Sequence, residues 1–501
     1  MPNRESAGWT PALSDYSQVF TEQNPWHSSG IVPPAWALPV ERPLARVLWK
    51  RLKANQPRRF QLVLGPRRVG KTTSLYQTAN RLIKEGVHPA RIWWLRMDHP
   101  LLMNLELGSL VRSIVKGAKA SLDDPIYLFI DELTYAKEWD KWLKTFYDEM
   151  WPVTIAGSSS STAAIQHART ESGVGRWEEQ YLAPYLFGEY LELFERPVRL
   201  NVGSDLKVTL EALASDRPPT LGLAELRRRF LLTGGFPELL ILAKASNEDE
   251  SSLLLDSQRT LRSDAVERAV YKDIPQAFGI DNPLLMERLL YTLAGQVGGV
   301  LSPSNICQSL ANISVPTFDR YLSYLERAFL VFTLPNFSGS ESARQARGKK
   351  LYFVDGAVRN AALQRGVAPL SNPEEMGLLT ENLAASHLHA LGQQAQVRLY
   401  HWRSHNAEVD LVFDQPDSPL AFEIASGPGH RRAGFRRFIE RYPRFKGSCY
   451  VVAPEVHTMS ARHADDGIGT IALDLFLLAV SAQAEAALGK NLAARQTRRT
   501  K

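Results

Sequence analysis

The stretch Gln61-Leu-Val-Leu-Gly-Pro-Arg-Arg-Val-Gly-Lys-Thr-Thr73 decides the fold of this chain of 501 residues. Its apolar start predicts a buried strand over 60–64, and the amphipathic residues 74–84 predict a helix. The glycines and the Gly-Lys-Thr ending between these elements have the spacing of a phosphate-binding loop. The stretch therefore predicts a P-loop inside an α/β domain.

The chemistry of such a loop explains its residue types. Gly65 and Gly70 allow a tight turn that directs backbone N–H groups at phosphates, and the following helix presents its positive end to the same anion. Lys71 is expected to reach the β- and γ-phosphates, and the Thr72 hydroxyl is expected to ligate Mg²⁺. We predict a nucleoside triphosphate and Mg²⁺ as cofactors, held by Gly65, Pro66, Arg67, Arg68, Val69, Gly70, Lys71, Thr72 and Thr73.

Polar residues follow two further predicted strands. The run 126–130 ends in Asp131 and Glu132, which we expect at the carboxyl edge of a parallel sheet, where Asp131 binds Mg²⁺ and Glu132 acts as general base. The strand 153–156 leads to Ser158 and Ser159, either of which is a candidate γ-phosphate sensor, with a flexible serine loop as the alternative. Arg176 is a candidate for stabilising transition-state charge, within the chain or across a subunit interface, with a solvated arginine as the alternative.

Strand-like and helical stretches alternate along much of the chain, which predicts an α/β protein with more than one domain. The expected strands of the carboxy-terminal part are 350–354, 397–402, 408–413, 421–424 and 448–452. We divide the chain into an irregular amino-terminal extension (1–35), a P-loop core (36–195), a helical lid or spacer (196–285), a winged-helix-like region (286–340), a second α/β domain (345–485) and a basic tail (486–501).

The composition excludes several classes of protein. Hydrophobic residues make up 44% and charged residues 22%, which is typical of a globular protein. Two distant cysteines, Cys307 and Cys449, do not form a disulfide framework or a cysteine-based zinc site. The apolar run 471–480 is too short to span a bilayer and predicts a packed helix, and the amino terminus lacks a signal-peptide pattern, so we expect a cytoplasmic protein.

Several segments, in order, resemble the prokaryotic AAA-type ATPases that carry a carboxy-terminal domain of unknown function. The segments are 42–44, 65–73, 129–139, 156–160, 175–176, 234–238, 321–334 and 408–410. The resemblance implies a P-loop ATPase core, then a winged-helix region, then a domain similar to the restriction-endonuclease fold.

The segments 302–310 and 314–325 have the rhythm of a helix–turn–helix, with Ser314 or Thr317 as the cap of the second helix. Arg320 and Arg327 are the cationic side chains available there for DNA, although such elements also serve as packing modules between domains. A basic run over 430–446 is a second candidate contact for a phosphate backbone, with a solvated helix face as the alternative.

The resemblance also implies a nuclease-like site in the last domain. Glu381, Asp410 and Glu423 fall at positions similar to its metal-binding carboxylates, with Glu408 as a neighbour. The expected Glu-x-Lys motif is Glu423-Ile-Ala425 here, so its lysine is missing. Substitutes for that lysine would have to come from Arg431, Arg432 or Arg436.

The sequence thus predicts a Mg²⁺-dependent ATPase whose nucleotide state controls its carboxy-terminal half. Two alternatives remain open at this point: an ATP-regulated nuclease, and a non-catalytic nucleotide-binding scaffold for protein partners. DNA, another nucleic acid or a protein is the candidate partner, and an oligomer is compatible with the sequence.

Overall fold

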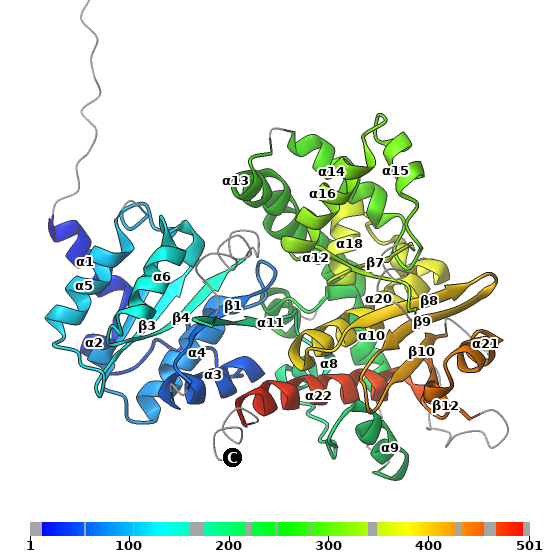
Figure 1. Cartoon of the computed structure of the whole chain (residues 1–501), viewed down its shortest axis with the longest axis horizontal. Coiled ribbons are helices and arrows are strands. Elements are labelled where there is room, and N and C mark those ends of the chain that lie inside the picture. The colour runs from blue at the N-terminus through cyan, green and yellow to red at the C-terminus, as the bar shows by residue number, and fades with distance from the viewer. Residues whose placement is uncertain are drawn as a thin grey trace, which may run out of the picture. The chain divides into compact units, whose positions relative to one another are not determined.

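The computed structural model describes residues 13–54, 57–103, 105–160, 175–216, 222–245, 249–280, 282–338, 348–425, 433–454 and 467–493. By their internal contacts these residues fall into two compact units (Figure 1). The first unit contains the described residues of 1–64 and 71–180. The second contains those of 65–70 and 181–501.

A five-stranded sheet forms the centre of the first unit, in the order β2-β3-β4-β1-β5. Its strands are β1 (Phe60–Leu64), β2 (Ile92–Arg96), β3 (Ile126–Asp131), β4 (Val153–Ser159) and β5 (Trp177–Tyr181). The pairs β2–β3, β3–β4 and β4–β1 are parallel. Every residue of β1 and β4 is buried, as expected for central strands of a parallel sheet that is covered on both faces.

Right-handed crossovers place the helices of this sheet. The connection through α4 (Lys71–Lys84) runs from β1 to the far edge strand β2, whereas α5 (Leu107–Gly117) and α6 (Trp139–Asp148) lead back across the sheet. Because the direction reverses, α4 covers one face and α5 and α6 cover the other. The helix α3 (Pro43–Ala54) packs against α4, and α5 packs against α6.

The expected irregular extension contains two helices, α1 (Leu13–Gln23) and α2 (Trp26–Ser29). Asn24 donates to the carbonyl of Trp94 at 3.1 Å and accepts from its N–H at 2.6 Å, and the indole of Trp26 donates to Ile92 O at 2.8 Å. These bonds satisfy backbone groups of the edge strand β2, so the segment protects that edge. The sequence shows no periodicity here because the fixing contacts are tertiary.

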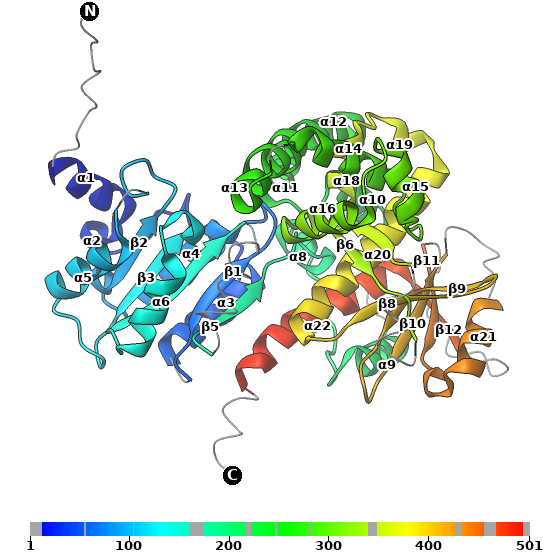
Figure 2. The same ribbon diagram turned by 45° about the horizontal axis from the view of Figure 1, so that its top comes forward.

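The second unit begins with helices and continues through a small hairpin (Figure 2). Its helices before the hairpin are α8 (Phe187–Leu193), α9 (Leu206–Asp216), α10 (Leu223–Thr233), α11 (Pro237–Ala245), α12 (Glu250–Leu261), the π-helical η4 (Arg262–Glu267) and η5 (Ala269–Asp273), α13 (Ile274–Phe278), α14 (Pro283–Ala294), α15 (Pro303–Ser309) and α16 (Val315–Arg327). The strands β6 (Val331–Leu334) and β7 (Lys350–Phe353) then pair antiparallel.

A second five-stranded sheet follows, in the order β12-β11-β10-β9-β8. Its strands are β8 (Leu399–Ser404), β9 (Ala407–Phe413), β10 (Leu420–Ile424), β11 (Cys449–Ala453) and β12 (Ile468–Ala472), and its helices are α18 (Gly356–Leu363), α19 (Ala368–Ser371), α20 (Pro373–Ala395), α21 (Ala433–Arg441) and α22 (Leu473–Ala493). The strands β8, β9 and β10 are antiparallel, whereas β10, β11 and β12 are parallel. The helix α20 contacts β8, β9 and β10, α22 contacts β11 and β12, and α21 packs on β9.

Two expected elements of the carboxy-terminal part differ from the structure. The strand predicted over 350–354 pairs with β6, so it belongs to the hairpin and not to the second sheet. The apolar run 471–480 was predicted to be one helix, but its first two residues end β12 and α22 begins at Leu473. A continuous apolar run carries no period that separates a buried strand from a buried helix. The helix α22 also extends to Ala493, beyond the expected start of the basic tail, while 494–501 lie outside the described residues.

Candidate functional site

The predicted phosphate loop connects β1 to α4, as the sequence indicates. Gly70 has a φ of 87° immediately before the helix, a conformation that glycine adopts without strain. A Cβ on Gly65 would lie 2.2 Å from the carbonyl oxygen of Leu182, so only glycine fits there. Lys71 is the first residue of α4 and is 6% exposed. The loop and the helix start therefore have the geometry that cradles an anion.

Thr72 and Asp131 lie together at the carboxyl end of the first sheet. The Thr72 hydroxyl donates to both carboxylate oxygens of Asp131, at 3.1 and 3.0 Å, and Ser158 donates to the same carboxylate. Burial raises the pKa of Asp131 to about 6, and the hydrogen bonds from Ser158 and Thr72 oppose this rise. A hydroxyl and a carboxylate at this distance form a pair of hard oxygen ligands that suits Mg²⁺.

The next residue, Glu132, is held by the neighbouring strand. Its backbone has φ 51° and ψ 49°, and its N–H donates to the Ser158 hydroxyl at 3.0 Å. Ser160 donates to the Glu132 carboxylate at 2.9 and 3.1 Å. Because Ile130 pairs with Gly157, the two acids and the serines after Gly157 lie at the same edge. Ser159 contacts Thr134 instead, at 3.3 Å.

Sequence reasoning proposed Ser158 or Ser159 as the polar group of this strand and missed Ser160. The structure brings Ser158 to Asp131 and Ser160 to Glu132. The strand order places β4 between β3 and β1, which is what aligns its serines with the acids. The run of serines in the sequence indicates polar groups at this edge, but it does not indicate which serine bonds to which acid.

Arg176 lies at the opposite edge of the same sheet. Its carbonyl accepts from the N–H of Phe60, the first residue of β1, whereas the phosphate loop follows the last residue of that strand. Its guanidinium pairs with Asp148 at 2.8 and 2.9 Å. A five-residue strand is about 17 Å long, so this position does not support a catalytic role within the chain.

Two arginines of the phosphate loop form ion pairs within the second unit. Arg67 forms a bidentate pair with Asp273, at the end of the π-helical segment. Arg68 pairs with Glu238 at 2.9 Å and with Asp264 at 2.7 Å. Carboxylates therefore contact the cationic side chains that the sequence assigned to the nucleotide.

The predicted nuclease-like carboxylates converge in the second unit, around a lysine that the sequence argument did not include. Lys350 Nζ lies 3.3 Å from Glu381 Oε1, 2.6 Å from Glu408 Oε1 and 3.0 Å from Asp410 Oδ1. Tyr352 also donates to Glu381, at 2.7 Å. We call these five side chains the Lys350 cluster.

Glu423 lies next to the Lys350 cluster, on the strand beside Asp410. Leu411 pairs with Phe422, so Glu423 is the cross-strand neighbour of Asp410, whose carboxylate also accepts from the N–H of Ile424 at 2.9 Å. Burial and the charge of Asp410 raise the pKa of Glu381 to about 7. The carboxylates of Asp410, Glu408 and Glu381 raise the pKa of Lys350 well above its ordinary value, against the effect of burial.

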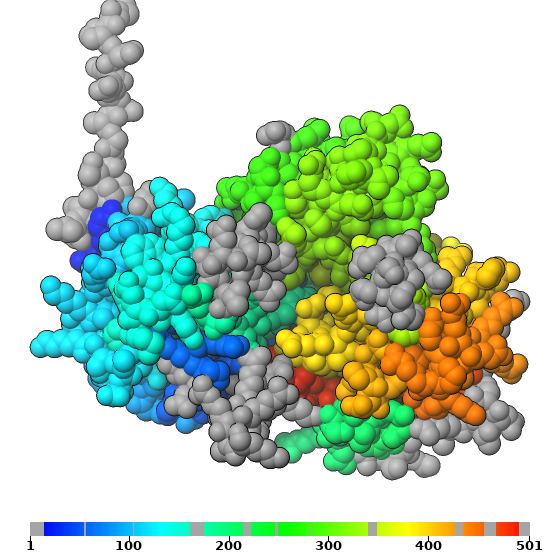
Figure 3. All heavy atoms as spheres, viewed as in Figure 1, coloured from blue at the N-terminus to red at the C-terminus, as the bar shows by residue number. Residues whose placement is uncertain are grey.

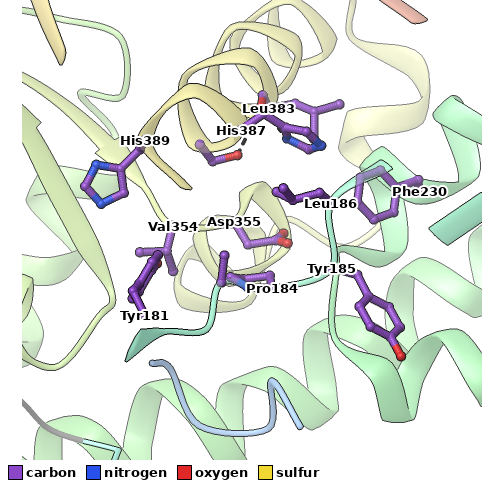
Figure 4. Close-up of a pocket in the computed structure, with 12 residues that line it drawn as sticks. Tyr181, Pro184, Tyr185, Leu186, Phe230, Val354, Asp355, Leu383, His387 and His389 are labelled. Atoms are coloured by element: carbon purple, nitrogen blue, oxygen red, sulfur yellow. Dashed lines mark hydrogen bonds between the residues drawn. The ribbon is translucent and has the colours of Figure 1, made fainter. Parts of the chain in front are cut away.

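A small cavity of about 10 Å³ lies near the Gly234-Gly-Phe-Pro segment (Figure 4). Asp355, on its wall, accepts from the N–H groups of Gly235 at 2.7 Å and Ala357 at 2.8 Å. His387 accepts from the N–H of Phe187 at 2.9 Å, and burial lowers its pKa to about 4. The cavity has room for about one water molecule and not for a nucleotide, so this polar cluster is structural.

The candidate DNA-contact residues are distributed over several elements. Ser314 caps α16 by accepting from the N–H of Thr317, and Arg320 is exposed on that helix, whereas Arg327 lies over the ring of Phe278. The α21 region lies on the surface (Figure 3), and its exposed arginines are Arg436, Arg437 and Arg441. Arg431 and Arg432 lie outside the described residues.

Two findings concern the described residues only. Cys307 and Cys449 are both free and buried there. No helix in the described ranges is long and apolar enough to cross a bilayer.

Three family models match separate parts of the chain. Residues 57–191 match the AAA domain, residues 224–368 match a domain of unknown function (DUF8612), and residues 376–472 match another (DUF4143). The α/β core expected from the sequence is thus confirmed by both the sheet and the family model. None of the three models identifies a winged helix or a nuclease.

Similar proteins have been recorded in archaea and bacteria. The uncharacterized protein MJ1544 of Methanocaldococcus jannaschii is 25% identical over 364 residues, which cover 72% of this chain and 73% of the relative. An uncharacterized protein of Haemophilus influenzae is 22% identical over 371 residues, 73% of this chain and 82% of the relative.

Among solved structures, the Aeropyrum pernix ORC1 protein in complex with DNA is 16% identical and covers 65% of this chain and 92% of its own. Its TM-score of 0.29 is too low to support an argument about this chain. The identification therefore depends on the AAA model and on the geometry of the loop and its acids. Residues 57–191 match the AAA domain, and they contain the strand, loop and helix start of a P-loop.

Proposed function

We propose that this protein binds ATP with Mg²⁺, hydrolyses it, and uses the nucleotide state to control its carboxy-terminal half. The observation that carries the proposal is the group at the sheet edge: Thr72 bonded to Asp131, and the adjacent Glu132 held by Ser160, the residue that follows β4. This arrangement exceeds what nucleotide binding alone requires, because Glu132 contributes nothing to holding phosphates.

Each side chain has a role that follows from its chemistry. Lys71 would neutralise the β- and γ-phosphates, and Thr72 and Asp131 would hold Mg²⁺, which supplies further neutralisation of charge on the phosphates when it is bound. Glu132 would accept the proton of the attacking water as general base. Ser160 would fix the direction of the Glu132 carboxylate.

The ion pairs of the loop arginines support a switch. Asp273 forms an ion pair with Arg67, and Asp264 forms one with Arg68. The phosphates of a nucleotide would attract the same two arginines. Both acids belong to the π-helical segment η4–η5, and π-helical turns occur frequently at functional sites. Arrival of a nucleotide would compete for these arginines, and its hydrolysis would return them to the carboxylates.

DNA is the partner we favour for the controlled half. Three helices (α14, α15 and α16) followed by the β6–β7 hairpin have the element order of a winged helix, with Arg320 exposed on α16. The exposed arginines of α21 add positive charge for a phosphate backbone. A DNA role predicts that the logarithm of the affinity falls linearly with the logarithm of the salt concentration, with a slope set by the number of phosphates that are neutralised.

The test is ATP turnover by the full chain with Mg²⁺, for the wild type and Lys71→Ala, with and without duplex or single-stranded DNA. The proposal predicts turnover that the variant abolishes, and stimulation by DNA would support the nucleic-acid role. Tight ATP binding with no turnover under any of these conditions would favour the scaffold alternative.

A further inference from the structure

The restriction-endonuclease-like fold that the sequence suggests for the last domain implies a divalent metal ion among its carboxylates. The Lys350 cluster allows this implication to be tested against the side chains present. Its three carboxylate oxygens converge on one point, and that point is the ammonium nitrogen of Lys350, 2.6–3.3 Å away. The ammonium donates to Glu381 and Asp410 and forms an ion pair with Glu408.

The residues do not fit a metal ion in this arrangement. Within the described ranges of the chain, no three histidine, cysteine, aspartate or glutamate side chains are disposed to hold one. The cluster has a formal charge of −2 when every acid is ionised, since one lysine faces three carboxylates. Without a metal ion, that negative charge repels a phosphodiester rather than activating it.

Lys350 is also fixed in its place. Its side chain is 2% exposed, and the three carboxylates raise its pKa well above the ordinary value, so it stays charged at neutral pH. Its backbone pairs with Leu334 of β6 and bridges to Val300, which determines the direction in which the side chain leaves the hairpin. A metal ion could enter only by displacing a buried and fully paired cation.

The position where a nuclease of this kind carries its lysine gives independent support. Ala425 is 2% exposed and belongs to an apolar cluster that includes Phe435 and Phe438. A lysine there would place an ammonium among aromatic side chains, which is unfavourable, so this part of the core suits a small apolar residue. The cation that faces the carboxylates comes instead from a different strand.

We propose that the Lys350 ammonium replaces the divalent cation, so that the would-be nuclease centre is an internal ionic joint without metal-dependent cleavage. The joint ties β7, which belongs to the hairpin, to α20 and β9 of the second sheet. The ion pairs of the buried Lys350 thereby hold the hairpin and the sheet together. Because the joint connects these segments, a movement of the hairpin displaces the sheet with it. The site does not cleave nucleic acid.

The experiment titrates the nucleotide-free full chain with Mn²⁺ and follows binding by electron paramagnetic resonance. All variants carry Thr72→Ala, which removes a magnesium ligand of the P-loop. The parent is expected to show no saturable binding, whereas Lys350→Met, which keeps the length of the side chain but not its charge, is expected to gain one Mn²⁺ per chain. Adding Asp410→Asn to Lys350→Met is expected to abolish the gained site, which distinguishes it from adventitious surface binding.

The parent chain decides the matter even if Lys350→Met fails to fold. Saturable Mn²⁺ binding by the parent that disappears in Asp410→Asn would overturn the proposal. Mg²⁺-dependent cleavage of DNA by the wild type that is lost in Asp410→Asn would do the same. ATP turnover, measured on the same chains with Thr72 restored, is expected to survive Lys350→Met, so this inference can fail while the proposed ATPase stands.

Discussion

The hydroxyl of Ser160 donates to the carboxylate of Glu132, 2.9 Å from Oε1 and 3.1 Å from Oε2. Ser160 is itself 6% exposed, so the bond is sheltered from water. The bond links the residue that follows β4 to the proposed general base, which follows the neighbouring strand β3. It makes Ser160 a positioning residue, because it acts on the reaction only through Glu132.

Ser160→Ala is expected to lower kcat for ATP about tenfold, a fraction of the ~10²–10⁴-fold contribution of a general base, because the carboxylate loses its direction. The KM for ATP should change little, since Ser160 is not expected to touch the nucleotide. Steady-state kinetics measure both. Thr154→Val is the matched control. Thr154 lies on β4 and is 2% exposed, and its hydroxyl has no hydrogen-bond partner among the described residues, so its loss should leave kcat unchanged.

Asp131→Asn is expected to stabilise the nucleotide-free protein while abolishing turnover. Burial raises the Asp131 pKa from 3.8 to about 6, so the folded protein keeps this proton to higher pH than the unfolded chain does. The stabilisation from the proton is complete below pH 3.8 and is lost as the pH rises through about 6. The asparagine variant stays neutral, and should gain about 3 kcal/mol over the wild type at pH 7.

Urea unfolding of both proteins at several pH values measures this difference. The gain should vanish below about pH 4, where the wild-type carboxyl is protonated in both states. An equal gain at every pH would show that the burial of a charge is not its cause.

Gly234→Ala is expected to destabilise the second unit by about 3 kcal/mol or more, through strain and a clash together. Gly234 has a φ of 76°, and a Cβ there would lie 2.7 Å from Ala357 Cβ and 2.8 Å from Asp355 Oδ1. Gly222, at the other end of α10, provides the control: its φ is 79°, but nothing lies within 4 Å of its Cβ position. Gly222→Ala should cost only about 1–2 kcal/mol by chemical denaturation. Equal costs would mean that the contact with Asp355 contributes nothing.

Asp273→Asn is expected to tighten ATP binding severalfold, because it releases Arg67 from a charged competitor for phosphate. Arg67→Ala should weaken binding. Fluorescence anisotropy with a labelled ATP analogue measures both affinities. The control is Asp256→Asn, which removes the partner of the exposed Arg259 on α12. It changes the net charge of the protein by the same amount and should leave the ATP affinity unchanged. If Asp273→Asn behaves like this control, the loop arginines do not couple nucleotide to the π-helical segment.

The sequence predicted the P-loop unit well because its signals are local. The strand before Gly65, the helix after Lys71 and the acids after 126–130 each depend on neighbouring residues, and the structure has all of them. Ser160 was missed because only strand pairing decides which serine faces Glu132. The predictions for the loop contacts with nucleotide stay predictions.

The carboxy-terminal part was less predictable because its decisive contacts join distant segments. The carboxylates Glu381 and Asp410 were named from a resemblance, but Lys350 lies on another strand and has no spacing that links it to them. The lack of a lysine after Glu423 therefore predicts that no lysine faces these carboxylates, whereas Lys350 of β7 pairs with two of them. The burial of Trp26 was unpredictable for the same reason. Trp26 packs against the edge strand β2, and no local sequence pattern predicts this tertiary contact.

The most direct test of the central claim compares ATP turnover and ATP binding for the wild type and Glu132→Gln. The glutamine keeps the size of the side chain and a hydrogen-bonding partner for Ser160, but it cannot accept a proton. The account predicts that Glu132→Gln lowers kcat by about 10²–10⁴-fold while ATP still binds with nearly wild-type affinity. Turnover unchanged by Glu132→Gln, or a wild type that binds ATP and never hydrolyses it, would contradict the assignment of this site as an ATPase.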